Sequence, residues 1–263
     1  MTYALETQIR GEGSPVLLLH SGGMSSRQWK KLAEALAPSY RVVLPDFLGS
    51  GANPVWPAGE PFTFGLDVDA VEAILQRLGE PVHIFGHSYG GFIAMKLAER
   101  NPTLVRSLAA FDPVAFGVLF DANDEAGIAS LISVSTPRFT DESTGGDDAW
   151  FELFVDYWNG AGTWGGMPAS GRDGFLKVGR KVLFEVMTLV ADRMPRSAYL
   201  PITAPALFMT GERSPAAGRR VAEILAETLP RGRVESTAGA GHMGPITHAN
   251  AVYALIVEHL ARA

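Results

Sequence analysis

One short stretch of the sequence could carry out nucleophilic chemistry. Ser88 lies at the centre of G-H-S-Y-G at 86–90, between an apolar run at 82–85 and a helical pattern at 92–100. A serine on a sharp turn between a strand and a helix exposes its hydroxyl, and the flanking glycines avoid collisions with neighbouring backbone. The amide of Tyr89, at the start of the helix, is free to donate a hydrogen bond to an oxyanion. The pattern therefore favours a serine nucleophile over an idle serine in a glycine-rich connection.

Apolar runs and helical patterns alternate in both end portions of the chain. The expected strands are residues 16–20, 41–45, 82–85, 104–111, 205–210 and 233–236. The expected helices are residues 26–37, 66–78, 92–100, 216–229 and 246–261. Apolar strands alternating with helices indicate a mostly parallel sheet covered by helices on both faces, which is the α/β class. Residues 113–200 break the alternation, so we expect a helical insertion in one domain built from 1–112 and 201–263.

The composition limits the classes of function. The chain has 263 residues, of which 47% are hydrophobic, and a net charge of −6, which offers no footprint for nucleic acid or an anionic membrane. The absence of cysteine excludes disulfides, thiolate metal sites and a cysteine nucleophile. We see neither a signal peptide nor an apolar run near the ~18–20 residues of a membrane span. We therefore expect a cytoplasmic protein that acts on a small-molecule substrate without metal or cofactor, and we make no prediction of its oligomeric state.

With these features the chain resembles the α/β-hydrolase fold superfamily along essentially its whole length. The segment L-L-L-H-S-G-G at 17–23 is similar to the family's strand that ends in His-Gly and carries the second oxyanion amide, with Ser21 in place of the usual glycine. The resemblance implies that Gly22 supplies this amide, with Gly23 as the next candidate. The segment D-F-L-G-S-G at 46–51 resembles a loop that is usually structural in this family.

A serine nucleophile needs a positioned base, and the sequence offers six histidines. His242 lies in the glycine loop A-G-A-G-H-M-G at 238–244, and it matches the family's catalytic histidine in place and surroundings. The other histidines are expected to have structural or surface roles: His20, His83, His87, His248 and His259. Among these, His87 is predicted to pack beside Ser88, and His259 to lie at the surface or the end of the last helix.

The carboxylate that orients the base has more than one candidate. The family usually supplies an aspartate in a G-x-x-D turn, but here that turn is G-E-R-S at 211–214, and Ser214 is predicted to cap the following helix instead. Asp112 ends the expected strand 104–111, a position from which some members of the superfamily take their acid. We favour Asp112. Glu212, two residues early in the usual turn, is the alternative, and a site without an acid is the third.

Residues 113–200 stand where the family inserts a helical cap that roofs the active site. Five cap aromatics are candidates for a substrate pocket, although packing between cap and core is the favoured interpretation for most of them: Trp150, Phe154, Tyr157, Trp158 and Trp164. The acidic stretch 121–148 is predicted to be a solvated loop.

Together these residues predict a cofactor-free serine hydrolase that cleaves a small to medium, mainly uncharged ester or lactone through an acyl-enzyme on Ser88. Three alternatives stay open: hydrolysis of a C–C bond in a diketone-like substrate, perhydrolysis, and a ligand-binding protein with little turnover.

Overall fold

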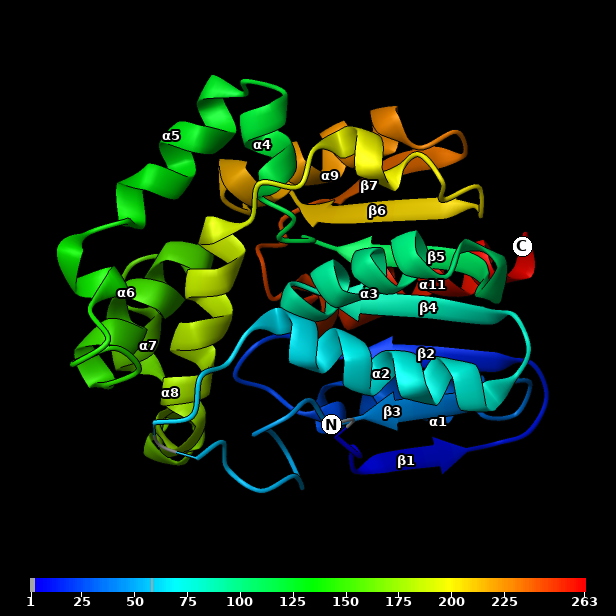
Figure 1. The fold of residues 1–263 in the computed structure, drawn as a ribbon, viewed down its shortest axis with the longest axis horizontal. Coiled ribbons are helices and arrows are strands. Elements are labelled where there is room, and N and C mark those ends of the chain that lie inside the picture. Colours follow the sequence, from blue (N-terminus) through cyan, green and yellow to red (C-terminus); the bar gives the residue numbers. More distant parts are fainter. Residues whose placement is uncertain (1–2, 58) are drawn as a thin grey trace.

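The computed structural model describes residues 3–57 and 59–263 and has a seven-stranded sheet at its centre (Figure 1). The strands run in the order β1-β3-β2-β4-β5-β6-β7, and every neighbouring pair is parallel except β1 with β3. Their bounds are Thr7–Arg10 (β1), Pro15–Leu19 (β2), Arg41–Pro45 (β3), Val82–His87 (β4), Val105–Phe111 (β5), Ala206–Gly211 (β6) and Gly232–Thr237 (β7). The predicted mostly parallel sheet is confirmed.

Helices cover both faces of the sheet, as the apolar strands predict. The main ones are α1 (Lys30–Leu36), α2 (Phe64–Leu78), α3 (Tyr89–Arg100), α9 (Ala216–Thr228) and α11 (Ala249–Ala261). Strand β2 shows the two-sided burial: Leu17 and Leu19 belong to the core with α2, α3 and α9, whereas Val16 and Leu18 belong to the core with α1 and α11. Side chains of a strand alternate between faces, so an all-apolar strand serves two cores at once.

Strand β1 was not predicted. Its residues T-Q-I-R are exposed or half-buried, and they pair antiparallel with β3 at the edge of the sheet. A short edge strand without an apolar run gives no burial pattern by which to recognise it.

The chain between β5 and β6 forms the inserted helical region. It contains α4 (Gly117–Asp121), α5 (Glu125–Val134), α6 (Asp148–Asn159), α7 (Thr163–Gly166) and α8 (Ala169–Ala191). Helices α4 and α5 pack against α9, while α6 to α8 lie beyond the carboxyl ends of the parallel strands (Figure 1). We call α6 to α8 the cap. Within the described residues, no helix is both long enough and apolar enough to cross a bilayer.

The prediction of a solvated loop at 121–148 is wrong, because α5 lies within it. The Asp124 side chain caps this helix by accepting a hydrogen bond from the Gly127 amide at 2.7 Å. Leu131 and Val134 are buried, so the helix has an apolar side despite its acidic start. The polar residues around it masked a short amphipathic pattern.

Candidate active site

Ser88 lies on a strained turn between β4 and α3, with φ 54° and ψ −117°. A Cβ added to Gly86 would lie 2.1 Å from the carbonyl oxygen of Gly90, and one added to Gly90 would lie 2.4 Å from the carbonyl oxygen of His20. Both distances are far below van der Waals contact, so glycine is required on each side of the turn. The close packing holds the serine in a backbone conformation that side-chain-bearing residues rarely adopt.

The register of the sheet brings three strand ends together. On β5, Phe111 pairs with His87 of β4 on one side and with Met209 of β6 on the other. The next residue of each strand therefore lies at the carboxyl edge of the sheet, where ligands of parallel α/β sheets bind. These residues are Ser88, Asp112 and Thr210.

The Asp112 carboxylate is fully buried and accepts three side-chain hydrogen bonds. Oδ1 accepts from the Thr210 hydroxyl at 2.7 Å, and Oδ2 accepts from the Ser214 hydroxyl at 2.5 Å. Nδ1 of His242 lies 2.9 Å from the same Oδ2. The Asp112 backbone has a positive φ of 43°, which turns the chain sharply where β5 ends. A buried carboxylate is stable only when it is paired in this way.

Ser214 does not cap α9, contrary to the prediction from sequence. The helix begins at Ala216, and the residue before it, Pro215, makes no side-chain cap. The Ser214 hydroxyl instead accepts a hydrogen bond from the Gly211 amide at 3.1 Å and donates to Asp112. It is buried, with 3% of its surface exposed. The serine in the usual acid turn therefore contacts the carboxylate that lies on the neighbouring strand.

Glu212 is exposed and does not contact His242 in the structure. Its Oε2 accepts a hydrogen bond from the Gly239 amide at 2.7 Å. The Arg213 amide donates to the Ala240 carbonyl at 2.8 Å, so the turn after β6 is attached to the glycine loop that carries His242. In the structure Asp112 contacts His242, whereas Glu212 binds Gly239 near the start of the glycine loop.

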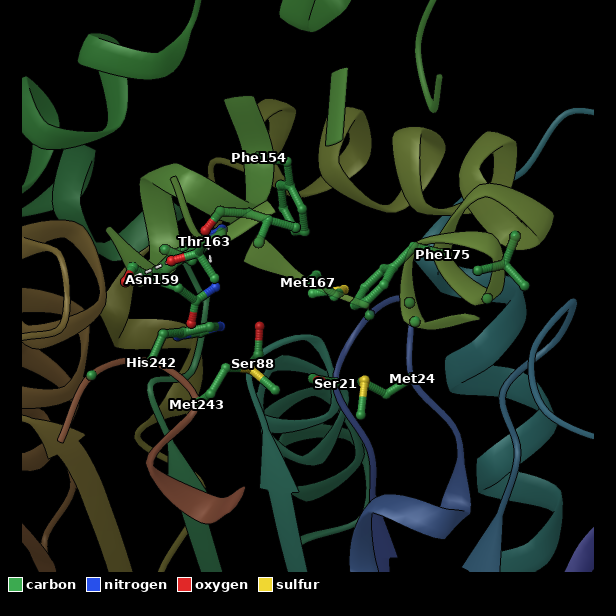
Figure 2. Close-up of a pocket in the computed structure, with 18 of the residues that line it drawn as sticks. Ser21, Met24, Ser88, Phe154, Asn159, Thr163, Met167, Phe175, His242 and Met243 are labelled. Atoms are coloured by element: carbon green, nitrogen blue, oxygen red, sulfur yellow. Dashed lines mark hydrogen bonds between the residues drawn. The ribbon is translucent and has the colours of Figure 1, made fainter. Parts of the chain in front are cut away.

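Three contacts fix the position of His242. Asp112 binds Nδ1, the Trp158 ring stacks on the imidazole with centroids 4.1 Å apart and planes at 27°, and His87 binds the main-chain carbonyl. Nε2 has no hydrogen-bond partner in the described part of the chain. Figure 2 shows the side chains of His242 and Ser88 facing the same cavity.

His87 does more than pack beside Ser88, which is a further correction. Its Nε2 donates to the His242 carbonyl at 2.8 Å, while its Nδ1 accepts from Gln28 Nε2, also at 2.8 Å. Gln28 Oε1 in turn accepts from the Ser21 amide at 3.0 Å and from its hydroxyl at 3.1 Å. Burial holds the pKa of His87 well below its ordinary value, so the ring is neutral and can both donate and accept. These hydrogen bonds form a polar chain from Ser21 to the glycine loop that carries His242. The sequence shows these polar residues but does not predict that they bind one another, because the partners are far apart along the chain.

The two residues whose amides are predicted to bind an oxyanion border the same small cavity as Ser88. Tyr89 is the first residue of α3, so its amide has no partner one turn earlier. Gly22 follows the end of β2, and in the described residues neither of these two amides donates to another group. Together with Ser88, Gly22 and Tyr89 border a small cavity of about 40 Å³.

A larger cavity of about 1170 Å³ lies between the core loops and the cap. Ser88 and His242 line it from below, and Phe154, Met167 and Phe175 line it from the cap (Figure 2). Tyr157 and Trp158 line both cavities.

The pocket prediction is wrong for Trp150 and Trp164. Both are buried in the apolar core of the cap, where Trp150 stacks on Phe139 and Trp164 stacks on Phe151, each with ring centroids 5.3 Å apart. Helical spacing groups Trp150 with pocket residues, and Trp164 was included as a nearby aromatic; neither observation distinguishes the face toward the cavity from the face toward the rest of the cap.

The remaining histidines are mostly structural. Nδ1 of His20 donates to the Ser21 carbonyl, and its Nε2 accepts from the Phe47 amide at 3.0 Å. His259, predicted at the surface or at the helix end, is buried and donates to the Leu108 carbonyl at 3.0 Å. Within the described ranges, no three His, Asp or Glu side chains cluster as metal ligands would.

Comparison with known proteins identifies the class. The model of the alpha/beta hydrolase family matches residues 16–255, so the chain belongs to the α/β hydrolase family. A lipase of Mycobacterium tuberculosis, named LipV, is 39% identical over 116 residues. This match covers 43% of each chain, so this chain spans less than half the length of that relative. A pimeloyl-acyl-carrier-protein methyl ester esterase of Chromobacterium violaceum is 29% identical over 260 residues, which are 95% of each chain.

Solved structures show the same fold at lower identity. A meta-cleavage product hydrolase aligns with a TM-score of 0.74 at 20% identity, covering 98% of this chain and 95% of that one. A thermophilic esterase from Thermogutta terrifontis aligns with a TM-score of 0.68 at 22% identity, covering 98% and 93%. At these identities the likeness concerns the fold.

Proposed function

We propose that this protein is a serine hydrolase that cleaves a small to medium, mainly uncharged ester or lactone through an acyl-enzyme on Ser88. The observation that carries the proposal is the 2.9 Å contact between His242 and the buried Asp112, beside a strained serine turn. The ester class is further supported by two relatives whose names describe a lipase and a methyl ester esterase.

The proposed reaction assigns a role to each of these groups. His242 Nε2 takes the proton of Ser88, whose oxygen attacks the substrate carbonyl. Asp112 holds Nδ1 of His242 protonated and stabilises the imidazolium. The amides of Tyr89 and Gly22 donate to the tetrahedral oxyanion. His242 then protonates the leaving alcohol and afterwards activates the water that releases the acid.

The lining of the larger cavity suits an uncharged substrate. Among the residues that the structure describes, no Asp or Glu lines it, and its Lys and Arg residues, Lys177 and Arg213, are exposed. The cap side presents Phe154, Met167 and Phe175, which are apolar. An ester with an apolar leaving group would therefore bury its hydrocarbon surface against the cap.

Activity-based labelling combined with a series of nitrophenyl esters of increasing acyl length tests the proposal. We expect a fluorophosphonate probe to label the wild type and the surface control Ser197→Ala, but not Ser88→Ala. Ester turnover should disappear in Ser88→Ala alone. An unlabelled wild type, or equal labelling of Ser88→Ala, would refute the nucleophile. Labelled protein that cleaves ring-fission diketones or forms peracids, but no ester, would replace the ester by one of the alternative reactions.

A further inference from the structure

The small cavity beside Ser88 contains one carboxyl group in otherwise apolar surroundings. Gly22, Ser88 and Tyr89 form its core side, and Glu185 of α8 reaches it from the cap. The rest of the lining is apolar or aromatic: Val114, Phe116, Leu131, Val134, Phe139, Phe154, Tyr157, Trp158, Val186, Leu189 and Val190. A carboxyl group in such a place is costly unless a partner satisfies it.

Only one oxygen of Glu185 has a partner in the described part of the chain. Oε1 accepts a hydrogen bond from Lys181, one turn earlier on α8. Oε2 makes no hydrogen bond and lies against the backbone of Gly22, since a Cβ added there would be 2.6 Å from it. The residue is 2% exposed, so the free oxygen faces the cavity and not bulk solvent.

Lys181 cannot turn away to serve the free oxygen. Its Nζ also donates to Asp67 Oδ2 at 2.8 Å and lies over the rings of Phe47, Phe62 and Tyr89. Asp67 itself accepts from the Tyr89 hydroxyl at 2.8 Å and from a main-chain amide at 2.9 Å. One buried cation therefore faces two carboxyl groups, and Asp67 holds it. Burial raises the pKa of Glu185 to about 7.

The two cavities divide the substrate between them. His242 must protonate the leaving oxygen, and it lines the larger cavity but not the smaller one. A leaving group that receives this proton would occupy the larger cavity, and the acyl chain would then enter the smaller one beside Gly22 and Tyr89. Because Ser88 and Glu185 line the same small cavity, an acyl chain bound there would lie against the Glu185 carboxylate.

We propose that Glu185 determines acyl specificity: its free Oε2 accepts a hydrogen bond from a hydroxyl or amino group near the scissile carbonyl of the acyl chain. The inference rests on the proposed function, because it uses the acyl-enzyme on Ser88 to orient the substrate. A pocket with an unsatisfied acceptor discriminates strongly against analogues that lack the donor.

The test compares nitrophenyl butanoate with its β-hydroxy, β-methoxy and β-amino derivatives. The hydroxy ester can donate, whereas the methoxy ester can only accept. At about pH 9, above the pKa of about 7 of Glu185, Oε2 is a carboxylate acceptor, and for the wild type we expect kcat/KM to be about tenfold or more higher for the hydroxy ester than for both the unsubstituted and the methoxy ester. The amino ester tests whether an ammonium or a hydroxyl is the preferred donor: its kcat/KM is higher than that of the hydroxy ester in the first case and lower in the second.

Glu185→Gln replaces the hydrogen-bond acceptor that faces the cavity by a donor of nearly the same size. The Lys181 ammonium binds the amide oxygen, which turns the amide NH₂ into the cavity as a donor. We expect the hydroxy-to-methoxy ratio of kcat/KM to fall to about one. Glu152→Gln, which removes an exposed carboxylate from α6 of the cap, is the matched control and should keep the wild-type ratio.

The possible outcomes separate this inference from the proposed function. Fluorophosphonate labelling of Glu185→Gln and its thermal midpoint show whether the variant is folded with an active Ser88. A wild type that hydrolyses butanoate without preferring the hydroxy or the amino ester overturns the inference and leaves the serine hydrolase standing. An unchanged hydroxy-to-methoxy ratio in labelled Glu185→Gln overturns it as well. A wild type that neither labels nor hydrolyses any ester overturns both.

Discussion

Asp112 receives hydrogen bonds from side chains of three separate segments, and no single donor holds it alone. Thr210 is the penultimate residue of β6, Ser214 follows in the turn after that strand, and His242 comes from the glycine loop after β7. Two neutral hydroxyls therefore hold the Asp112 carboxylate in place without help from the imidazole of His242. Ser214 stands where the family's usual turn would place an aspartate, and its hydroxyl donates to Asp112, which follows the neighbouring strand.

Removing the Ser214 hydroxyl should destabilise the protein and slow the reaction. In Ser214→Ala the buried Asp112 carboxylate loses one donor that solvent cannot replace, which costs about 1–3 kcal/mol of unfolding free energy. Urea denaturation and ester turnover measure the two effects. The exposed Ser197→Ala should change neither quantity. Wild-type stability in Ser214→Ala would show that the hydroxyl does not support the carboxylate.

At the scale of single residues, the sequence indicates groups whose neighbours are close along the chain. Ser88 is recognisable because both of its glycines lie two residues away along the chain, although the group that excludes a side chain at Gly90 is the distant His20 carbonyl. The partner of Ser214 is 102 residues away, so the serine could only be read as a helix cap. The same applies to His87, whose acceptor carbonyl is 155 residues distant.

At the scale of elements, a chain of hydrogen bonds joins two loops at the carboxyl edge of the sheet. It runs from Ser21, after β2, through Gln28 and His87 to the carbonyl of His242. The loop after β2 that carries Ser21 and Gly22 and the glycine loop that carries His242 are therefore held in fixed positions relative to each other. Catalysis is sensitive to displacements of about 1 Å between such groups.

Breaking this chain at Gln28 should lower kcat more than it changes KM. Gln28→Leu leaves His87 Nδ1 without its donor and frees the Ser21 amide, so the two loops lose their common restraint. We expect kcat to fall by about tenfold, which steady-state kinetics with a nitrophenyl ester would measure. Gln76→Leu, at an exposed position on α2, is the control. A rise in KM alone would place the chain in substrate binding instead.

The elements that sequence patterns predict are those in which most residues, or those of one whole face, are buried. Strand β4 and helix α3 lie near their expected bounds, because nearly all their residues are buried. Strand β1 was missed because it is a short edge strand, and α5 because acidic residues surround its few buried positions. The contact of Trp158 with His242 depends on how α6 lies over the core, which local periodicity does not contain.

At the scale of the whole molecule, buried neutral histidines should make folding sensitive to acid. Burial lowers the pKa of His20, His83 and His259 to about 4, from 6.5 in the unfolded chain. Between these values the unfolded state binds more protons than the folded state, so stability is present above pH 6.5 and is lost as the pH falls toward 4.

The urea midpoint should therefore decrease as the pH is lowered from about 6.5 to 4, with each histidine contributing at most ~1.4 kcal/mol per pH unit. His259→Gln should flatten this dependence, whereas His248→Gln, on a half-buried residue before α11, should retain it. A urea midpoint that is constant across this range would mean that these histidines are protonated in the folded protein.

In the proposed serine hydrolase, the carboxylate that orients His242 comes from Asp112 at the end of β5. The most direct measurement is ester turnover by Asp112→Asn beside its matched control, Glu212→Gln. An asparagine cannot hold the imidazolium and favours the wrong tautomer of His242, so kcat should drop by about 10³–10⁴ while the folded state persists. Glu212→Gln keeps an oxygen for the Gly239 amide and should retain nearly all activity. Near-normal turnover in Asp112→Asn, with activity lost in Glu212→Gln, would contradict the account.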